Sequence, residues 1–312
     1  MQRIEFRAMN CQMLAVMDSD TAEVSTLLAK VPAWFEAWEQ RLSRFRADSD
    51  LSLLNQRSGE WVNVHADLLS VIDTALRAAK FSDGLVVPTL LSALEGAGYD
   101  RSFELINPDQ TLQREMIREA GPDWQDIEID AGSMRVYLPA GMRLDLGGVV
   151  KGWAAEQAAT RLGQWGAALV DAGGDIAMQG TRADAEPWPI GVADPLQPDE
   201  QLDTLLIPSG SVATSGRDYR RWRITGSGAD TRIWQHHILD PRTGQPAQTD
   251  VMSATVIAPQ MMWAEAAAKT ALILGSNEGL TWIEAHSNLA TTLVLEDGQV
   301  LHSQRMSDYT WK

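Results

Sequence analysis

The sequence predicts an α+β fold with mixed antiparallel sheets and packed helices, in place of a doubly wound parallel sheet. Two observations favour this class. Short alternating segments separated by glycine-containing turns recur through the second half of the chain, as they do in antiparallel hairpins. Long stretches with apolar residues at helical spacing lie before and between these segments.

The N-terminal part is expected to begin with a strand over residues 4–18, followed by a helix. Asp20 and Thr21 are both possible helix caps, and apolar residues recur at helical spacing from Val24 to Leu42. Because Pro32 lies inside this stretch and lacks a backbone N–H, the helix is expected to kink or divide there.

The middle of the chain is expected to alternate between helix and strand. Residues 44–56 indicate a loop with a short helical turn, and residues 65–84 indicate a second amphipathic helix that Gly84 closes. Residues 126–148 have the pattern of three strands separated by turns. The charged segment 102–124 is predicted to be a surface insertion.

The C-terminal half is expected to begin with a helix over residues 149–162 that stops at Gly163. A strand pair over residues 167–180 follows, broken at Gly173 and Gly174. The remaining predicted elements are β-rich segments at 187–195, 202–216 and 221–241, a strand at 252–259, a helix at 263–275 and a hairpin at 289–303.

Composition places the chain among ordinary globular proteins. It has 312 residues, 45% hydrophobic and 22% charged, so we expect one domain over residues 1–312 built of two closely packed lobes. No run approaches the roughly 18 apolar residues that span a bilayer, which predicts no membrane insertion. A secretory signal needs an uninterrupted apolar core, and Arg3, Glu5 and Arg7 break the N-terminal stretch. A cytoplasmic location is therefore expected.

Charge and cysteine content exclude several classes of function. The net charge of −16 makes nucleic-acid binding a poor expectation, because that function needs positive charge against phosphates. An anionic ligand would need a helix N-terminus, a buried cation or a metal ion to offset this charge. The single cysteine, Cys11, excludes an intramolecular disulfide and a cysteine-built metal cluster.

A strand-to-helix junction, RLDLGGVVKGWAAEQAA (143–159), carries more chemistry than a connector needs. Gly147 and Gly148 let the backbone approach a ligand, and the first N–H groups of the following helix favour a phosphate or carboxylate. Lys151 opposes the helix dipole unless an anionic partner lies near, and Asp145 can cap the turn or accept a ligand donor. A tight connection with an ordinary cap is the alternative interpretation.

Two further glycine-containing segments can also be interpreted either as part of a ligand site or as ordinary turns. LVDAGGDIAMQG (169–180) forms a corner after an apolar strand, lacks the glycine pattern of a dinucleotide-binding turn and opens no helix, so a hairpin turn is the alternative. SVATSGRDYRRW (211–222) brings hydroxyl groups next to Arg217, Arg220 and Arg221, whose guanidinium groups suit phosphates. A basic, solvated turn explains this second segment equally well.

The segment HHILDPRTGQP (236–246) joins a strong turn signal to two histidines. Adjacent residues of a strand face opposite sides, so only one of His236 and His237 can line a site. A histidine near a nucleotide is the natural general base at neutral pH, whereas a lone histidine more often has a structural role.

Taken together and in this order, six segments resemble those of the ApbE-type flavin transferases, the FAD:protein FMN transferases. No single segment decides the matter, but the ordered set spans nearly the whole chain. The segments are SRFRADSDLSLLN (43–55), DLGGVVKGWAAE (145–156), LVDAGGDIAMQG (169–180), SVATSGRDYRRW (211–222), HHILDPRTGQP (236–246) and TVIAPQMMWAEAAAKTALILG (255–275).

The resemblance implies a T-fold-related α+β domain that holds FAD in a cleft between two lobes. Members of this family cleave the FAD pyrophosphate with Mg²⁺, attach FMN through a phosphoester to a threonine or serine of an acceptor flavoprotein, and release AMP. The alternatives are an FAD-binding protein without transferase activity and an FAD pyrophosphatase that gives FMN and AMP.

The resemblance also implies roles for individual residues. His237 is similar to the residue that activates the acceptor hydroxyl. Gly148, Glu265 and Lys269 stand at the positions of the family's metal site. The positions that match FAD-binding residues are Phe45, Glu95, Gly96, Asp145, Lys151, Gly174, Ser215, Arg217 and Ile238.

The metal positions depart from the family's pattern. Glu265 and Lys269 stand where the family has aspartate and threonine, four residues apart on a helix. Glutamate can bind Mg²⁺ through its longer side chain, but a protonated lysine binds no metal. Two interpretations stay open: a helix ion pair that replaces the metal site, or an ammonium that takes over part of the metal's neutralising role. Thr270 lies about 100° further round the helix.

Overall fold

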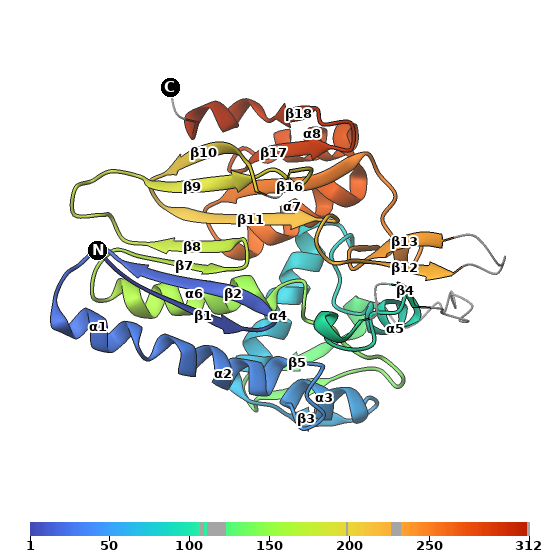
Figure 1. Ribbon diagram of the computed structural model, residues 1–312. Helices are drawn as coiled ribbons and strands as arrows, with labels where there is room; N and C mark the ends of the chain where they lie inside the picture. The colour runs from blue at the N-terminus through green and yellow to red at the C-terminus, as the bar shows by residue number, and fades with distance from the viewer. Residues whose placement is uncertain (107–108, 111–122, 198, 226–231, 311–312) are drawn as a thin grey trace. The chain divides into compact units, whose positions relative to one another are not determined.

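The computed structural model confirms the α+β class (Figure 1). Most of the predicted insertion at 102–124 lies outside the described part of the chain. Among the described residues, no helix combines the length and apolar character needed to cross a bilayer. The structure describes residues 1–106, 109–110, 123–197, 199–225 and 232–310.

The chain divides into two compact units, each assembled from segments that are distant in sequence. The cleft between two lobes stays a prediction, as does the single domain over residues 1–312. The first unit comprises Met1–Ala37, Val149–Gly216 and Thr249–Lys312, and the second comprises Trp38–Gly148 and Arg217–Gln248.

An eight-stranded antiparallel sheet forms the centre of the first unit. Its central strands are rich in Ala, Val, Leu and Ile, as expected of strands buried on both faces. In spatial order the strands are β1 (Gln2–Ala8), β2 (Cys11–Met17), β7 (Ala168–Ala172), β8 (Asp175–Gln179), β11 (Gly210–Gly216), β16 (Val251–Ala258), β17 (Ala290–Leu295) and β18 (Val300–His302).

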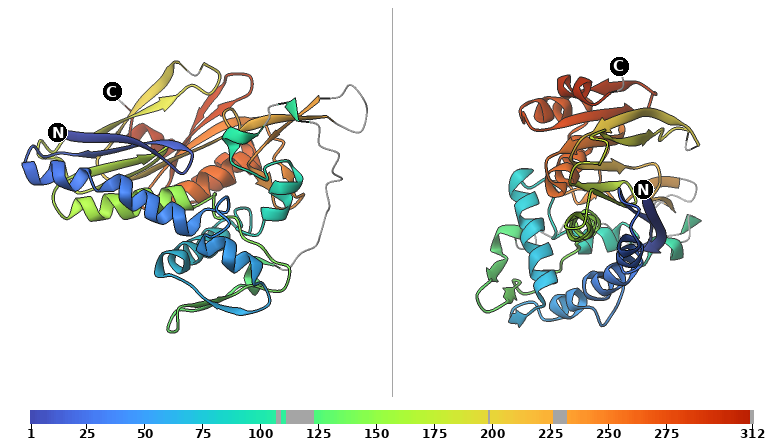
Figure 2. Two further views of the ribbon diagram at one scale, coloured as in Figure 1. Left: turned by 60° about the horizontal axis from the view of Figure 1, so that its bottom comes forward. Right: turned by 90° about the vertical axis from the view of Figure 1, so that its left-hand side faces the viewer.

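Helices and a separate hairpin cover this sheet (Figure 2). The two long helices α6 and α7 run side by side along one face, and the hairpin β9–β10 covers the other. The covering elements are α1 (Ala22–Leu28), α6 (Val150–Gly163), α7 (Met261–Leu274), α8 (Ser276–Glu284), β9 (Trp188–Ala193), β10 (Gln201–Ile207) and the 3₁₀ helix η3 (Gln304–Asp308).

The alternation of side chains along β8 decides which residues face the helices. Met178 packs against Trp188 in the apolar cluster under the hairpin β9–β10. Its neighbour Gln179 points the other way and lies against Gly163 of α6. Asp175 is four residues before Gln179, so its carboxylate also faces α6 and α7. The first unit thereby places a carboxylate at the helix-facing start of β8.

The second unit is built from short helices and small sheets around an apolar cluster that includes Leu94, Tyr99 and Trp222. The helix α2 begins in the first unit and ends in the second. The elements are α2 (Val31–Leu42), α3 (Asp50–Gln56), α4 (Ala66–Phe81), α5 (Leu91–Gly96), the 3₁₀ helices η1 (Phe103–Leu105) and η2 (Trp124–Asp126), the sheet β3 (Trp61–Asn63)–β6 (Arg135–Tyr137)–β5 (Glu128–Asp130), the sheet β13 (Arg232–His236)–β12 (Arg221–Thr225)–β4 (Asp109–Gln110) and the ribbon β14 (Leu239–Asp240)–β15 (Gln245–Pro246).

The expected single strand over residues 4–18 is wrong, because β1 and β2 form a hairpin there. Met9 and Asn10 occupy its two-residue turn with φ values of 48° and 58°. Such a turn needs positive φ at both central positions, which asparagine tolerates and methionine rarely adopts. The sequence therefore carries only half of the usual turn signal.

The third strand expected within residues 126–148 is also absent, since residues 142–146 make no strand. The side-chain oxygen of Asn55 accepts the N–H of Leu144 at 2.8 Å, and its side-chain nitrogen donates to the carbonyl of Leu144 at 2.9 Å. The N–H of Asp145 donates to the carbonyl of Pro88 at 2.8 Å. Because these partners replace those of a neighbouring strand, the segment is fixed in a non-sheet path.

The predicted helices are largely confirmed. The stretch from Val24 to Leu42 divides into α1 and α2, with Pro32 as the second residue of α2, where its missing N–H breaks no helical hydrogen bond. Gly84 follows α4 with φ of 80°, and its N–H donates to the carbonyl of Ala79 at 2.8 Å. The short helices α5 and α8 were not predicted.

Candidate functional site

The turn between β7 and β8 is a hairpin turn, which settles the structural interpretation of that segment. Gly173 and Gly174 have φ values of 71° and 94°, a region that favours glycine. The carboxylate of Asp171 accepts the N–H of Gly174 at 2.8 Å. Burial raises the pKa of Asp171, and the nearby carboxylate of Asp175 adds to the rise. The turn therefore holds exposed backbone beside two acidic groups.

Lys151 has the anionic partner that its place in the first turn of α6 requires. Its ammonium forms an ion pair with the carboxylate of Asp175, whose side chain is only 4% exposed. The carbonyl of Ala172 lies 3.4 Å from the same ammonium. The predicted FAD-binding lysine is thus fixed between the start of α6 and the β7–β8 turn.

Glu265 and Lys269 lie one turn apart on α7, beside this pair. The carboxylate of Glu265 is 1% exposed, and its Oε1 lies 3.8 Å from Nζ of Lys269. The pKa of Glu265 is raised to about 8, chiefly by burial and also by the charge of Asp175, while the ammonium groups of Lys269 and Lys151 oppose the rise. Two carboxylates and two ammonium groups therefore form one buried charge cluster.

The residues of this cluster do not fit a divalent metal ion. Position 269 presents an ammonium, which repels a cation and has no lone pair to offer. Within the described ranges, no group of three His, Cys, Asp or Glu side chains is placed to hold a metal. Gly148, the third predicted metal position, belongs to the second unit. The side-chain donors in the first unit are thus too few for the oxygen-rich shell that Mg²⁺ takes.

In the second unit, Asp145 pairs with Arg44. The Nε of Arg44 lies 2.5 Å from Oδ2 of Asp145, and both side chains are largely buried. The other carboxylate oxygen accepts the N–H of Gly147 at 2.9 Å, so Asp145 also fixes the glycine turn. Asp145 was expected to cap the turn or to accept a donor group of a ligand. Within the protein, Gly147 and Arg44 already supply these two contacts.

Aromatic rings surround the guanidinium of Arg44. Its carbon Cζ lies 4.2 Å from the ring centre of Phe45 and 4.7 Å from that of Tyr99. Tyr99 also lies against Trp222, with ring centres 5.6 Å apart, and Arg44 donates to the carbonyl of Tyr99 at 2.7 Å. Phe45 is 38% exposed, so part of its ring is open to solvent and available to a flat ligand.

Glu95 and Gly96 end the short helix α5 in the same unit. The carboxylate of Glu95 accepts two hydrogen bonds from Arg143, at 2.7 and 3.2 Å. Around Gly96 there is open space where a side chain would begin. A ligand can approach the backbone closely at this glycine.

The histidine pair is resolved by burial. His236 is 7% exposed, its Nε2 donates to the carbonyl of Ala247 at 3.0 Å, and its Nδ1 accepts the N–H of Ile238 at 3.3 Å. Burial lowers the pKa of His236 to about 4, and Arg217 adds to the effect. His236 is therefore a neutral structural residue, which leaves His237, half-buried, as the candidate base.

Ser215 is the second-last residue of its segment in the first unit, and Arg217 begins the next segment, which belongs to the second unit. Ser215 is buried on β11, and Arg217 lies just beyond the strand, partly buried beside His236. Arg217 is thus partly shielded from solvent, and its charge acts on a buried histidine.

The ordered motifs and the α+β fold agree with one family. The family model described as the ApbE family matches residues 9–293. The chain belongs to the ApbE family. The resemblance of the chain to this family, first inferred from six short segments, is therefore confirmed over most of the chain.

Individual members of the ApbE family show the extent of the similarity. The FAD:protein FMN transferase of Treponema pallidum is 29% identical over 319 residues, which cover 96% of this chain and 85% of that protein. The enzyme of the same name from Vibrio cholerae is 27% identical over 282 residues, covering 88% and 81%. The crystal structure of the ApbE protein of Thermotoga maritima superposes with a TM-score of 0.86 at 27% identity, covering 100% of this chain and 99% of that one.

The structure distributes the predicted site residues of this ApbE-family chain over both units. It also adds two residues to which the sequence prediction gave no role, Asp175 and Trp222. The anionic partner that Lys151 requires is the signal that could have identified Asp175. The first unit holds Lys151, Gly174, Ser215, Glu265 and Lys269, and the second holds Phe45, Glu95, Gly96, Asp145, Gly148, Arg217, His237 and Ile238.

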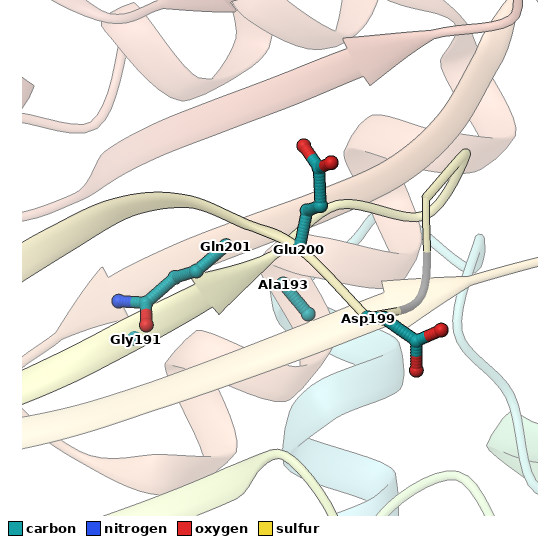
Figure 3. Close-up of a pocket in the computed structure, with 5 residues that line it drawn as sticks. All are labelled: Gly191, Ala193, Asp199, Glu200 and Gln201. Atoms are coloured by element: carbon teal, nitrogen blue, oxygen red, sulfur yellow. The ribbon is translucent and has the colours of Figure 1, made fainter.

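A hollow beside the β9–β10 hairpin is separate from these residues (Figure 3). None of the residues that line it was predicted to bind or react. The lining residues are Gly191, Ala193, Asp199, Glu200 and Gln201.

Proposed function

We propose that this chain is an FAD:protein FMN transferase that attaches FMN to a threonine or serine of an acceptor flavoprotein and releases AMP. The match of the ApbE family model over residues 9–293 carries the proposal. The curated relatives that bear this name cover most of the chain and are themselves covered over more than four fifths of their length. A cytoplasmic location stays a prediction.

In the proposed reaction the acceptor hydroxyl oxygen attacks the phosphorus on the FMN side of the pyrophosphate. The bond from that phosphorus to the bridging oxygen breaks, and AMP leaves with the bridging oxygen. The hydroxyl proton passes to His237, the candidate general base. Phosphoryl transfer of this kind depends mainly on positioning and on neutralising the phosphate oxygens.

The chain offers two kinds of contact for FAD. In the first unit, the ammonium of Lys151 and the N–H groups that begin α6 suit phosphate oxygens, and Gly174 has no side chain to keep a ligand from the β7–β8 turn. In the second unit, the exposed face of Phe45 and the open backbone of Gly96 suit the flat flavin or adenine rings. Arg217 adds positive charge close to the histidine pair.

The family implies Mg²⁺ in addition. The described residues at Glu265 and Lys269 do not fit that ion, so no step of the proposed reaction is assigned to it.

The test is a transfer assay on the purified chain. It is incubated with FAD and an acceptor domain that carries a threonine flavinylation site, and AMP and covalent flavin on the acceptor are measured. AMP together with fluorescent acceptor supports the proposal, and an acceptor whose threonine is replaced by alanine should stay unlabelled. AMP without labelled acceptor indicates hydrolysis, and bound FAD without AMP indicates a binding protein.

Variants of two histidines sharpen this assay. His237→Asn is expected to lose transfer while FAD still binds, because the base acts on the acceptor hydroxyl and not on FAD. His302→Asn, the same change on the exposed strand β18, is the matched control and should transfer normally. Transfer by His237→Asn at the wild-type rate would place the base elsewhere.

A further inference from the structure

The buried carboxylate of Glu265 has an unusual environment for an acidic group. The side chain is 1% exposed, and neither of its oxygens has a hydrogen bond of good geometry from the described residues, although the nearby backbone N–H of Gly152 lowers its pKa. A buried carboxylate without such bonds requires a cation nearby to stay charged. The ammonium of Lys269 lies within ion-pair distance, 3.8 Å from Oε1.

The packing of α6 against α7 holds this carboxylate in place. A side-chain carbon added at Gly152 would lie 2.4 Å from Oε2 of Glu265 and 2.5 Å from Cγ of Met261. Glycine at position 152 therefore provides the room that the carboxylate occupies. The carboxylate cannot move toward α6, and Lys269 reaches it from its own helix.

When Glu265 is ionised, each carboxylate of the two ion pairs has its own cation. Lys151 neutralises Asp175, and Lys269 lies beside Glu265. The side chain of Lys269 is 18% exposed, whereas that of Glu265 is 1% exposed. A divalent cation added at Glu265 would face this ammonium at short range, and repulsion between the two would oppose its binding.

We propose that the ammonium of Lys269 is the resident cation at Glu265 and occupies the place of a divalent metal ion. The first unit then binds neither Mg²⁺ nor Mn²⁺ through Glu265. This chain releases AMP from FAD in the presence of EDTA, a statement that rests on the proposed function.

Metal binding tests the assignment without any activity assay. Mn²⁺ is titrated into the wild type, Glu265→Gln and Glu278→Gln, and bound Mn²⁺ is measured by electron paramagnetic resonance. Glu278 is exposed on α8, so its variant is a matched control for ions held loosely by surface carboxylates. The three curves are expected to coincide. A Mn²⁺ site present in the wild type and in Glu278→Gln but lost in Glu265→Gln overturns the proposal.

Replacing the ammonium tests the same assignment in the other direction. Lys269→Thr removes the cation and adds a hydroxyl one helical turn from the carboxylate. This variant is expected to gain one Mn²⁺ site that Glu265→Gln/Lys269→Thr lacks. A folded Lys269→Thr variant that gains no site overturns the proposal. If it does not fold, the comparison of wild type with Glu265→Gln decides alone.

AMP release separates this inference from the proposed function. Wild-type rates that agree within about twofold in EDTA and in Mg²⁺ support it, and a loss of more than about tenfold in EDTA that Mg²⁺ restores overturns it. If no AMP appears in either buffer, the proposed function fails. The Mn²⁺ titrations still decide which cation Glu265 holds.

Discussion

The Nε of Arg44 lies 2.5 Å from Oδ2 of Asp145, with only 6% and 14% of the two side chains exposed. Removing the carboxylate would leave a buried guanidinium without its counter-ion. Asp145→Ala is therefore expected to lower the free energy of unfolding by about 3–5 kcal/mol. It is also expected to weaken FAD binding, because Arg44 positions Phe45 and Tyr99. Urea denaturation and FAD fluorescence titration measure the two effects.

An exposed pair in the same unit supplies the control. Asp100 and Arg101 form an ion pair whose side chains are 40% and 55% exposed. Asp100→Ala should leave the unfolding midpoint nearly unchanged, because solvent screens such pairs. An Asp145→Ala variant as stable as Asp100→Ala would mean that the buried pair contributes nothing.

His236 predicts an acid-sensitive contribution to stability. Its pKa is about 4 in the folded protein because the ring is buried, against 6.5 in the unfolded chain. Between these values the unfolded state binds more protons, so protonation favours unfolding. Stability from this residue is complete above pH 6.5 and falls by about 3 kcal/mol as the pH drops to about 4.

Urea denaturation between pH 4 and 7 of the wild type, His236→Gln and His302→Asn measures this contribution. The pH slope should flatten in His236→Gln and stay unchanged in His302→Asn. Equal slopes in all three proteins would show that another group dominates the acid response.

Gly152→Ala is expected to destabilise the chain, against the usual rule. Alanine normally favours a helix over glycine by about 1 kcal/mol. Here its Cβ would lie 2.4 Å from Oε2 of Glu265. Forcing a methyl group into a packed interface costs about 1–3 kcal/mol, so a net loss is expected. Gly96→Ala on α5 meets open space and should unfold at the wild-type midpoint or slightly higher. Two variants of equal stability would contradict the close packing of α6 on α7.

The elements predicted correctly are those whose neighbouring residues in the sequence are enough to determine their structure. Glycines at 173 and 174 gave the β7–β8 turn, and the apolar period gave α4, α6 and α7. The prediction failed where residues far away in the sequence determine the backbone path. Asn55 holds Leu144 out of a strand from 89 residues away. No pattern within residues 142–146 reveals that partner.

The candidate site shows the same division. The place of Lys151 in a helical first turn predicts an anionic partner, but not that Asp175 supplies it. The spacing of Glu265 and Lys269 predicts an ion pair on one helix face, which the structure confirms at 3.8 Å. The burial of Glu265 depends on Gly152, which belongs to a helix more than 100 residues earlier in the chain. The spacing of residues along the sequence could not show that Glu265 is buried against Gly152.

Lys151 and Asp175 allow structure and ligand binding to be separated. Lys151→Met would leave a carboxylate that is 4% exposed without its cation, so a loss of about 3–5 kcal/mol in unfolding free energy is expected. Lys151→Met/Asp175→Asn removes both charges and should recover most of that stability, since a neutral pair needs no counter-ion. FAD binding should stay weak in both variants, because the ammonium proposed to meet the phosphates is gone. Thermal unfolding and FAD titration on the same samples measure this. Wild-type FAD affinity in the double variant would reduce Lys151 to a purely structural partner of Asp175.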